Sequence, residues 1–248
     1  MIPRRFHPLG RFPSRVAFLI SGLLVCLAGM QTARAAAPAD SAKWEKDIAA
    51  FEAGDRLQAP PRQAILFLGS SSIRLWKTLA EDFPEWRVIN RGFGGSQVAD
   101  SLAYVDRLVL PYQPRQIVFY AGDNDLAAGK TPKQVAADFR AFVGKVRKAL
   151  PQCRISYIAI KPSPSRWQLE KQGREANQRI ARWMRGRKRL DFIDVWTPML
   201  GADGRPRAEL FVQDRLHLNA EGYRLWAGLV RPCLDPPDRP GGAAASGR

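Results

Sequence analysis

Short apolar runs alternate with longer amphipathic segments through most of the chain, and this alternation constrains the fold more than any other feature. Segments with helical periodicity, such as KQVAADFRAFVGKVRKAL, separate the runs. The runs are AILFL (64–68), RVIN (87–90), QIVFY (116–120), ISYIAI (155–160) and DFIDVW (191–196). Continuous apolar strands alternating with helices are typical of a parallel sheet covered on both faces. The sequence therefore predicts an α/β fold, a three-layer α/β/α sandwich around a parallel sheet of about five strands.

Polar and glycine-rich stretches follow each of the predicted strands. These stretches are GSSS (69–72), RGFGGSQ (91–97), AGDND (121–125), KPSPSRW (161–167) and QDRLHLN (213–219). In an open parallel sheet the ligand binds at the carboxyl ends of the strands, where such loops gather. The residues able to do chemistry are therefore predicted to meet at one end of the sheet.

The first 35 residues have the composition of a secretory signal peptide. Residues 1–15 carry four arginines and no acidic residue, residues 16–30 are apolar, and small residues surround Ala35. A membrane anchor is the alternative, but a spanning helix needs about 20 apolar residues. We therefore expect export to the periplasm or the medium. The predicted division is a signal peptide (1–35), a helical lead-in (36–60), one folded domain (61–234) and a disordered tail (235–248).

The chain is basic, with a formal net charge of +16. Loss of the arginines in the signal peptide would reduce this charge without cancelling it. For an exported protein, a basic surface favours contact with an anionic envelope or membrane surface over nucleic acid. No pattern in the sequence points to a metal or an organic cofactor.

Two cysteines, Cys153 and Cys233, remain beyond the signal peptide. Cys153 begins a predicted strand and Cys233 lies near the end of the last predicted helix, so both should lie at the amino end of the sheet. Disulfides persist in exported proteins. A disulfide between the two is therefore geometrically feasible, with two free thiols as the alternative.

Serine is a weak nucleophile until a neighbouring base removes its proton, and the base needs a group that orients it. His217 is the single histidine beyond the signal peptide, and Asp214 precedes it by three residues. Backbone N–H groups from the serine and glycine loops, together with the Asn124 amide, could stabilise an oxyanion. The alternatives are a structural histidine and an ordinary turn at GDND.

The stretches FLGSSS, GFGGS, GDND and DRLH, in this order, resemble the four sequence blocks of the SGNH hydrolases, or GDSL-type esterases and lipases. The resemblance extends to the lysophospholipase/thioesterase and platelet-activating-factor acetylhydrolase-like branch. It implies a flavodoxin-like sandwich with Ser71 as nucleophile. It also implies an oxyanion hole from the Ser71 N–H, the Gly95 N–H and the Asn124 side chain, with Asp214 and His217 completing the triad. The chain departs from the family in having Ser70 where an aspartate is usual.

The expected function is that of an exported serine hydrolase that cleaves carboxylic esters through an acyl-enzyme. Its substrate would be a short acyl ester, such as an acetylated envelope sugar, or a lysophospholipid-like ester. Lys161, Arg166 and Trp167 would line the rim of the substrate pocket, unless their loop is only a proline-stiffened surface segment. A non-catalytic binding module of the cell envelope that retains the hydrolase fold is the alternative from another class.

Overall fold

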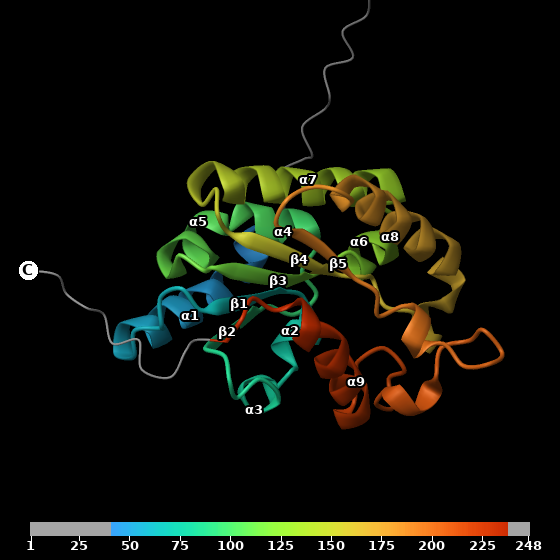
Figure 1. Cartoon of the computed structure of the whole chain (residues 1–248). Helices are drawn as coiled ribbons and strands as arrows, with labels where there is room; N and C mark the ends of the chain where they lie inside the picture. Colours follow the sequence, from blue (N-terminus) through green and yellow to red (C-terminus); the bar gives the residue numbers. More distant parts are fainter. Residues whose placement is uncertain (1–40, 238–248) are drawn as a thin grey trace, which may run out of the picture. The chain divides into compact units, whose positions relative to one another are not determined.

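A five-stranded, all-parallel sheet forms the centre of the computed structural model, which describes residues 41–237 (Figure 1). The strand order is β2-β1-β3-β4-β5. The strands are β1 (Ile65–Gly69), β2 (Val88–Gly92), β3 (Gln116–Tyr120), β4 (Arg154–Ile158) and β5 (Leu190–Ile193). The predicted parallel sheet and its five strands are confirmed.

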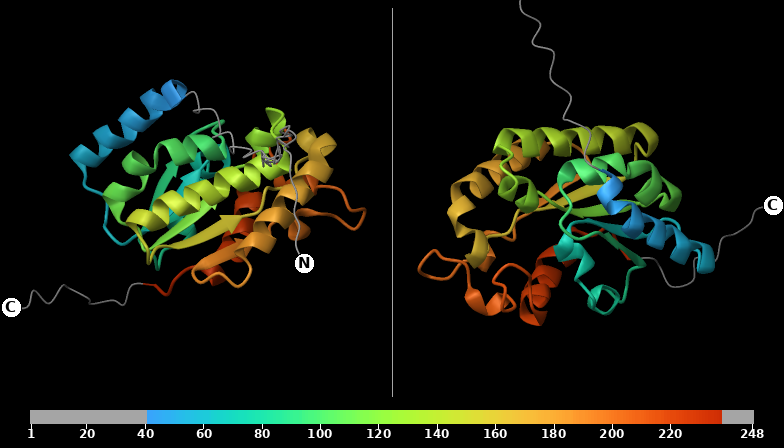
Figure 2. Two further views of the ribbon diagram at one scale, coloured as in Figure 1. Left: turned by 90° about the horizontal axis from the view of Figure 1, so that it is seen from above. Right: turned by 180° about the vertical axis from the view of Figure 1, so that it is seen from behind.

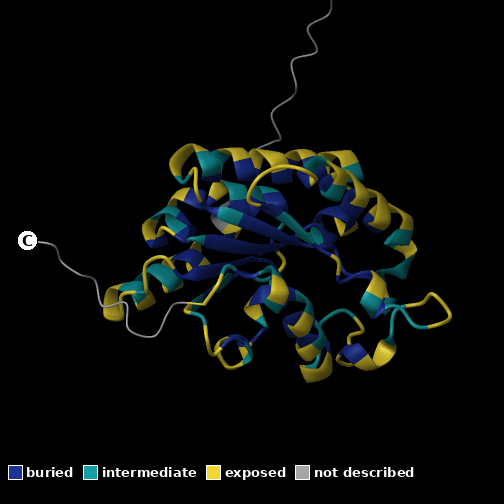
Figure 3. Cartoon of the chain, viewed as in Figure 1, coloured by how far each residue is buried: buried dark blue, intermediate teal, exposed yellow. Residues whose placement is uncertain are grey.

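Helices cover both faces of the sheet. One face carries α4 (Val98–Ala103), α5 (Val105–Leu108), α7 (Pro132–Ala149) and α8 (Glu170–Met184), and the other carries α2 (Ser71–Arg74), α3 (Leu79–Asp82) and α9 (Ala220–Val230). Neighbouring residues of a strand point to opposite faces. In β1, Leu66 accordingly packs with the first helices and Phe67 with the second. All five residues of β1 are buried, which explains its unbroken apolar sequence (Figure 3).

Helix ends coincide with the capping residues that the sequence offers. The Thr131 side chain accepts a hydrogen bond from the Gln134 N–H, and Gln134 in turn accepts from the Thr131 N–H, which closes a capping box at α7. Asn219 caps α9 through the Gly222 N–H at 3.0 Å. These bonds satisfy backbone donors that have no partner inside the helix. The α9 cap also fixes the chain direction immediately after His217.

The lead-in helix α1 (Glu45–Leu57) packs on the outside of the layer that contains α5, as the view from behind shows (Figure 2). Its buried Ile48 joins the core cluster on that face of the sheet. Arg107 of α5 forms ion pairs with Glu45 and Glu52 of α1. The helix therefore belongs to the same folded body as the sheet.

The predicted signal peptide, the first part of the lead-in and all but three residues of the predicted tail lie outside the described residues. Within residues 41–237, no helix has both the length and the apolar character needed to cross a bilayer.

Cys153 and Cys233 are free thiols, so of the two alternatives that the sequence left open the structure has the free thiols and not the disulfide. Both lie at the amino end of the sheet: Cys153 directly precedes β4, and the Cys233 carbonyl accepts a hydrogen bond from Gln116 at the start of β3. Each sulfur instead contacts a carbonyl of its own segment, Arg154 O at 3.4 Å and Leu229 O at 3.8 Å. Burial raises the pKa of the Cys153 thiol to about 12. Two cysteines at the same end of a sheet therefore need not form a disulfide, because each sulfur can contact its own segment instead.

Candidate active site

Gly69 ends β1 and turns the chain into α2. Its φ is +142°, and a Cβ atom there would lie 1.8 Å from the Tyr120 carbonyl oxygen, so no residue with a side chain fits. The Ser70 N–H donates to that same carbonyl at 2.9 Å. The tight turn places Ser71 at the start of α2, at the carboxyl end of the sheet.

The three consecutive serines have different environments. Ser70 and Ser72 are 0% and 1% exposed, whereas Ser71 is half-buried and lines a cleft of about 350 Å³. The Ser71 hydroxyl is therefore the one of the three that a substrate in this cleft can reach.

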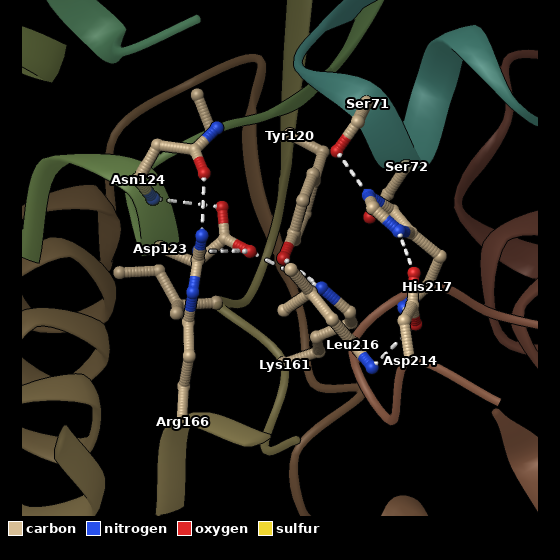
Figure 4. A network of polar contacts seen from close by, with 12 residues as sticks. Ser71, Ser72, Tyr120, Asp123, Asn124, Lys161, Arg166, Asp214, Leu216 and His217 are labelled. Atoms are coloured by element: carbon tan, nitrogen blue, oxygen red, sulfur yellow. Dashed lines mark hydrogen bonds and ion pairs between the residues drawn. The ribbon is translucent and has the colours of Figure 1, made fainter. Parts of the chain in front are cut away.

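Ser71, His217 and Asp214 form a hydrogen-bonded chain (Figure 4). His217 Nε2 lies 3.0 Å from Ser71 Oγ, and Nδ1 lies 2.5 Å from Asp214 Oδ2. With Nδ1–H donating to the carboxylate, Nε2 is left as the acceptor for the serine proton. The arrangement is that of a nucleophile, a base and a group that orients the base.

Asp214 is held by its own loop. Its Oδ1 accepts the backbone N–H groups of Leu216 at 2.8 Å and His217 at 2.9 Å. Partial burial opposes ionisation, but these bonds and the imidazole lower the pKa of Asp214 to about 2. The side chain is nevertheless 47% exposed. Asp214 is therefore a carboxylate at any pH at which the protein would act.

Gly95 and Asn124 line the same cleft as Ser71. Asn124 lies in the first turn of α6 (Asp123–Ala127), which starts after Gly122. Gly122 has a φ of +126°, and a Cβ atom there would meet Ile160 at 2.7 Å. Gly95 has a φ of +75° and packs against the Trp44 ring, which an added Cβ atom would approach to 3.3 Å. Two turns that require glycine thus place hydrogen-bond donors of two loops in the cleft of Ser71.

The buried Asp125 connects these two loops. Its carboxylate accepts the Val98 N–H at 3.1 Å and is paired with Lys130 Nζ, also at 3.1 Å. Lys130 in turn pairs with Asp138 of α7 at 2.8 Å. Burial raises the pKa of Asp125 to about 6, although the positive charge of Lys130 acts to lower it. This charge cluster holds α6 beside the start of α4, which follows the loop of Gly95.

The predicted rim residues all line a hollow beside the cleft, but they differ in exposure, and of the three Arg166 also lines the cleft itself. Lys161 is not on the rim of the cleft: its side chain is 1% exposed, and Nζ contacts Tyr120 Oη at 3.1 Å and Asp123 Oδ2 at 3.2 Å. Arg166 lines the cleft beside Asn124. Trp167 lies in a neighbouring hollow, where its ring is 6.3 Å from that of Trp196. The loop that begins at Lys161 turns toward the interior at this first residue. This explains why the side chain of Lys161 is buried while that of Arg166 is partly exposed.

Sequence reasoning missed several residues that shape the site. Trp44, on the predicted lead-in, supports the glycine loop, and Lys130 neutralises Asp125. The sequence did offer a signal for the pairing of Lys130 with Asp125, because the lysine follows the last aspartate of GDND by five positions. Nothing in the sequence indicated that Trp44 packs on Gly95, since 51 positions separate them.

The sequence matches the model of the GDSL-like lipase/acylhydrolase family over residues 67–225, which is more than half of the chain. The chain belongs to this family. Membership agrees with the resemblance found in the four sequence blocks, and it indicates a hydrolase that acts on carboxylic esters. No curated protein matches the sequence.

Solved structures with the same fold include other members of this family. A structure from Streptococcus pneumonia that is named for platelet activating factor has a TM-score of 0.69 and 20% identity, covering 78% of this chain and 94% of its own. A GDSL-like lipase from Bacteroides thetaiotaomicron has a TM-score of 0.63 and 18% identity, covering 78% and 96%. The acetyl xylan esterase AlAXEase has a TM-score of 0.56 and 20% identity, covering 69% and 99%. At these identities the likeness establishes the fold alone.

Proposed function

We propose that the protein is an exported serine esterase in which Ser71 forms an acyl-enzyme. The observation that carries this proposal is the 3.0 Å contact between Ser71 Oγ and His217 Nε2, with Asp214 on the opposite ring nitrogen. A serine, an imidazole and a carboxylate in hydrogen-bond reach of one another suit acyl transfer to water.

In the proposed reaction, His217 Nε2 takes the proton of Ser71 as Oγ forms a bond to the ester carbonyl carbon. The carbonyl oxygen becomes an oxyanion that accepts hydrogen bonds from the Ser71 N–H, the Gly95 N–H and the Asn124 amide. When the C–O bond to the alcohol breaks, the imidazolium gives its proton to the departing alkoxide. Water then attacks the acyl-enzyme by the same proton path and releases the acid.

Short acyl esters of polar alcohols suit the cleft better than long-chain lipids do. Its lining is largely polar, with Asp47, Arg74 and Arg166 around the nucleophile and Leu216 as the one larger apolar side chain. The aromatic hollow beside Trp167 offers only about 20 Å³, enough for about one water molecule. Within this cleft and the hollow beside Trp167, an acyl chain of many carbons would therefore find little apolar surface. We place lysophospholipid-like esters second.

Activity-based labelling tests the proposal. A fluorophosphonate probe should label the purified protein at Ser71, and Ser71→Ala should abolish both the label and the hydrolysis of p-nitrophenyl acetate. Ser70→Ala and Ser72→Ala are matched controls from the same turn and should still be labelled. Undiminished labelling of folded Ser71→Ala would refute the proposal. A non-catalytic binding module would give no label even in the parent protein, which would refute the proposal as well.

A panel of p-nitrophenyl esters from acetate to decanoate tests the substrate class. We expect kcat/KM to fall steadily as the acyl chain lengthens. A maximum at eight to ten carbons would instead favour the lysophospholipid-like class, because such a chain must have found an apolar site.

Export rests on the composition of residues 1–35. We expect the protein from the producing cell to lie outside the cytoplasm and to begin near residue 36. Amino-terminal sequencing of the fractionated protein checks this, and an intact start at Met1 in the cytoplasmic fraction would contradict it. The basic surface suggests contact with anionic envelope polymers, which binding to anionic and neutral vesicles at low and high salt would test.

A further inference from the structure

The side-chain amide of Asn124 is fixed at both of its polar atoms. Its Oδ1 accepts from Arg166 Nη2 at 3.0 Å, and its Nδ2 donates to the Ser96 carbonyl at 3.0 Å. An amide nitrogen carries two hydrogens, so one remains for the cleft. Turning the amide over would set its NH₂ group against a guanidinium, which has no acceptor, and would lose both bonds.

Arg166 is itself held by an ion pair with Asp123. Its Nη1 lies 3.2 Å from Asp123 Oδ2, which also contacts the buried Lys161 Nζ at 3.2 Å. Burial opposes the ionisation of Asp123, but Lys161 and Arg166 together keep the pKa of this carboxyl below its ordinary value. The Asp123 Oδ1 accepts the backbone N–H of Asn124 at 3.0 Å. Arg166 and Asp123 thus contact Asn124 directly, and Lys161 on the far side of Asp123 makes the net charge of the three side chains positive.

We propose that Arg166 is a positioning residue that orients and polarises the Asn124 amide for the oxyanion. This inference rests on the proposed esterase function. A cation bound to the amide oxygen draws electron density from the amide nitrogen, so the remaining N–H becomes a stronger donor. A donor that is already aimed where charge develops requires no reorganisation during the reaction. Lys161 and Asp123 supply the buried support for Arg166.

Two other roles for Arg166 would give different kinetics. Because Arg166 lines the cleft, it could bind an anionic part of a substrate directly, which would raise KM when the arginine is removed. It could also serve stability alone, which would lower the melting temperature and leave the folded enzyme with normal kcat. The positioning role predicts a loss of kcat that depends on the presence of Asn124.

A double-mutant cycle with a neutral ester as substrate separates these roles. On Arg166→Met we expect kcat to fall by roughly 10- to 100-fold and KM to change by less than about threefold, since the interaction forms in the transition state. In the Asn124→Ala background the same substitution should change kcat by less than about twofold, because its partner is already absent. Arg166→Lys retains a charge near Asp123 but lacks the planar guanidinium. Its kcat should therefore lie between that of the parent and that of Arg166→Met.

Arg205→Gln is the matched control. This exposed arginine stacks on Trp167, the residue next to Arg166, at 5.5 Å from the ring centre and is not bonded to Asn124. Its kcat should stay within about twofold of the parent, since no contact to the oxyanion donors is lost. A large loss in this control would show that the cycle reports general disturbance of the loop, and would overturn the inference.

Three further results would also overturn the inference: an equal loss of kcat from Arg166→Met with and without Asn124, a change confined to KM, and a lower melting temperature with normal kcat. If Arg166→Met does not fold, Arg166→Lys carries the cycle. The esterase proposal fails separately, when folded Ser71→Ala retains activity. Normal kcat in Asn124→Ala, with Ser71→Ala inactive, would overturn the inference and leave the esterase proposal standing.

Discussion

The two halves of the active site are built in opposite ways. The proton-transfer half, His217 with Asp214, is on an exposed loop and is held by hydrogen bonds within four consecutive residues. The oxyanion half is supported by buried charges: the side chains of Asp125 and Lys161 are 0% and 1% exposed. Contacts between distant parts of the chain, such as those of Lys161 and Arg166 with Asp123, hold the second half together.

This difference matches what each half must do. In the proposed mechanism the imidazole becomes a cation during the reaction and then returns to neutrality, so access to solvent and a nearby ionised carboxylate would both help it. The oxyanion donors must instead be in place before the charge appears, because moving dipoles during the reaction would cost part of their stabilisation. Burial raises the cost of leaving any of these charges unpaired, which holds the donors to one arrangement.

The largest effect should follow from damage to the exposed half. On Asp214→Asn we expect kcat to fall by about 10⁴, because an amide facing Nδ1 favours the wrong tautomer of His217. The melting temperature should change little, since an asparagine oxygen can still accept the two backbone N–H groups of the loop. Kinetics with p-nitrophenyl acetate and a thermal melt together check this.

Asp203→Asn is the matched control for that substitution. Asp203 also lies on an exposed loop and accepts a backbone N–H, that of Arg205, at 2.9 Å. Its variant should retain parental kcat. If Asp214→Asn behaved in the same way, the carboxylate would have only a structural role and the contrast between the halves would disappear.

Damage to the buried half should have the next largest effect. On Asn124→Ala we expect kcat to fall by about 10²–10³, or roughly 3–4 kcal/mol, with KM little changed, because one oxyanion donor is lost. Asn124→Asp should be at least as slow, since a carboxylate would face a charge of its own sign. Normal kcat and a lower melting temperature would instead indicate a turn residue.

The smallest effect concerns the stability of the buried half. The pKa of Asp125 is raised to about 6, above its unfolded value of 3.8, so the folded protein holds this proton more tightly than the unfolded chain does. The resulting stability is present below about pH 4 and is lost as the pH rises through about 6. The loss amounts to at most about 3 kcal/mol in the free energy of unfolding.

Denaturant unfolding of the parent and Asp125→Asn at pH 4.5 and pH 7.5 measures this linkage. Asparagine cannot ionise, so the variant should gain stability relative to the parent as the pH rises. A difference between the two proteins that stays constant with pH would show that Asp125 does not titrate in this range.

Much of the fold follows from local sequence. Consecutive apolar residues, as in AILFL, are needed where both faces of a strand are covered, so the strand positions were predictable. The caps Thr131 and Asn219 act on residues three positions away and were predictable for the same reason. The free thiols of Cys153 and Cys233 were not, because side-chain direction depends on the packing around each residue.

The sequence by itself determined the chemistry available and the local part of the site. Asp214 and His217 meet because they are three positions apart in one turn of loop, and Gly69 turns the chain because it has no Cβ atom. Tertiary structure alone decided which distant groups meet. Ser71 and His217 are 146 positions apart, and Arg166 and Asn124 are 42. These contacts arise because the strand order β2-β1-β3-β4-β5 sets which loops are neighbours at the carboxyl end of the sheet, and that order reflects the packing of the whole chain.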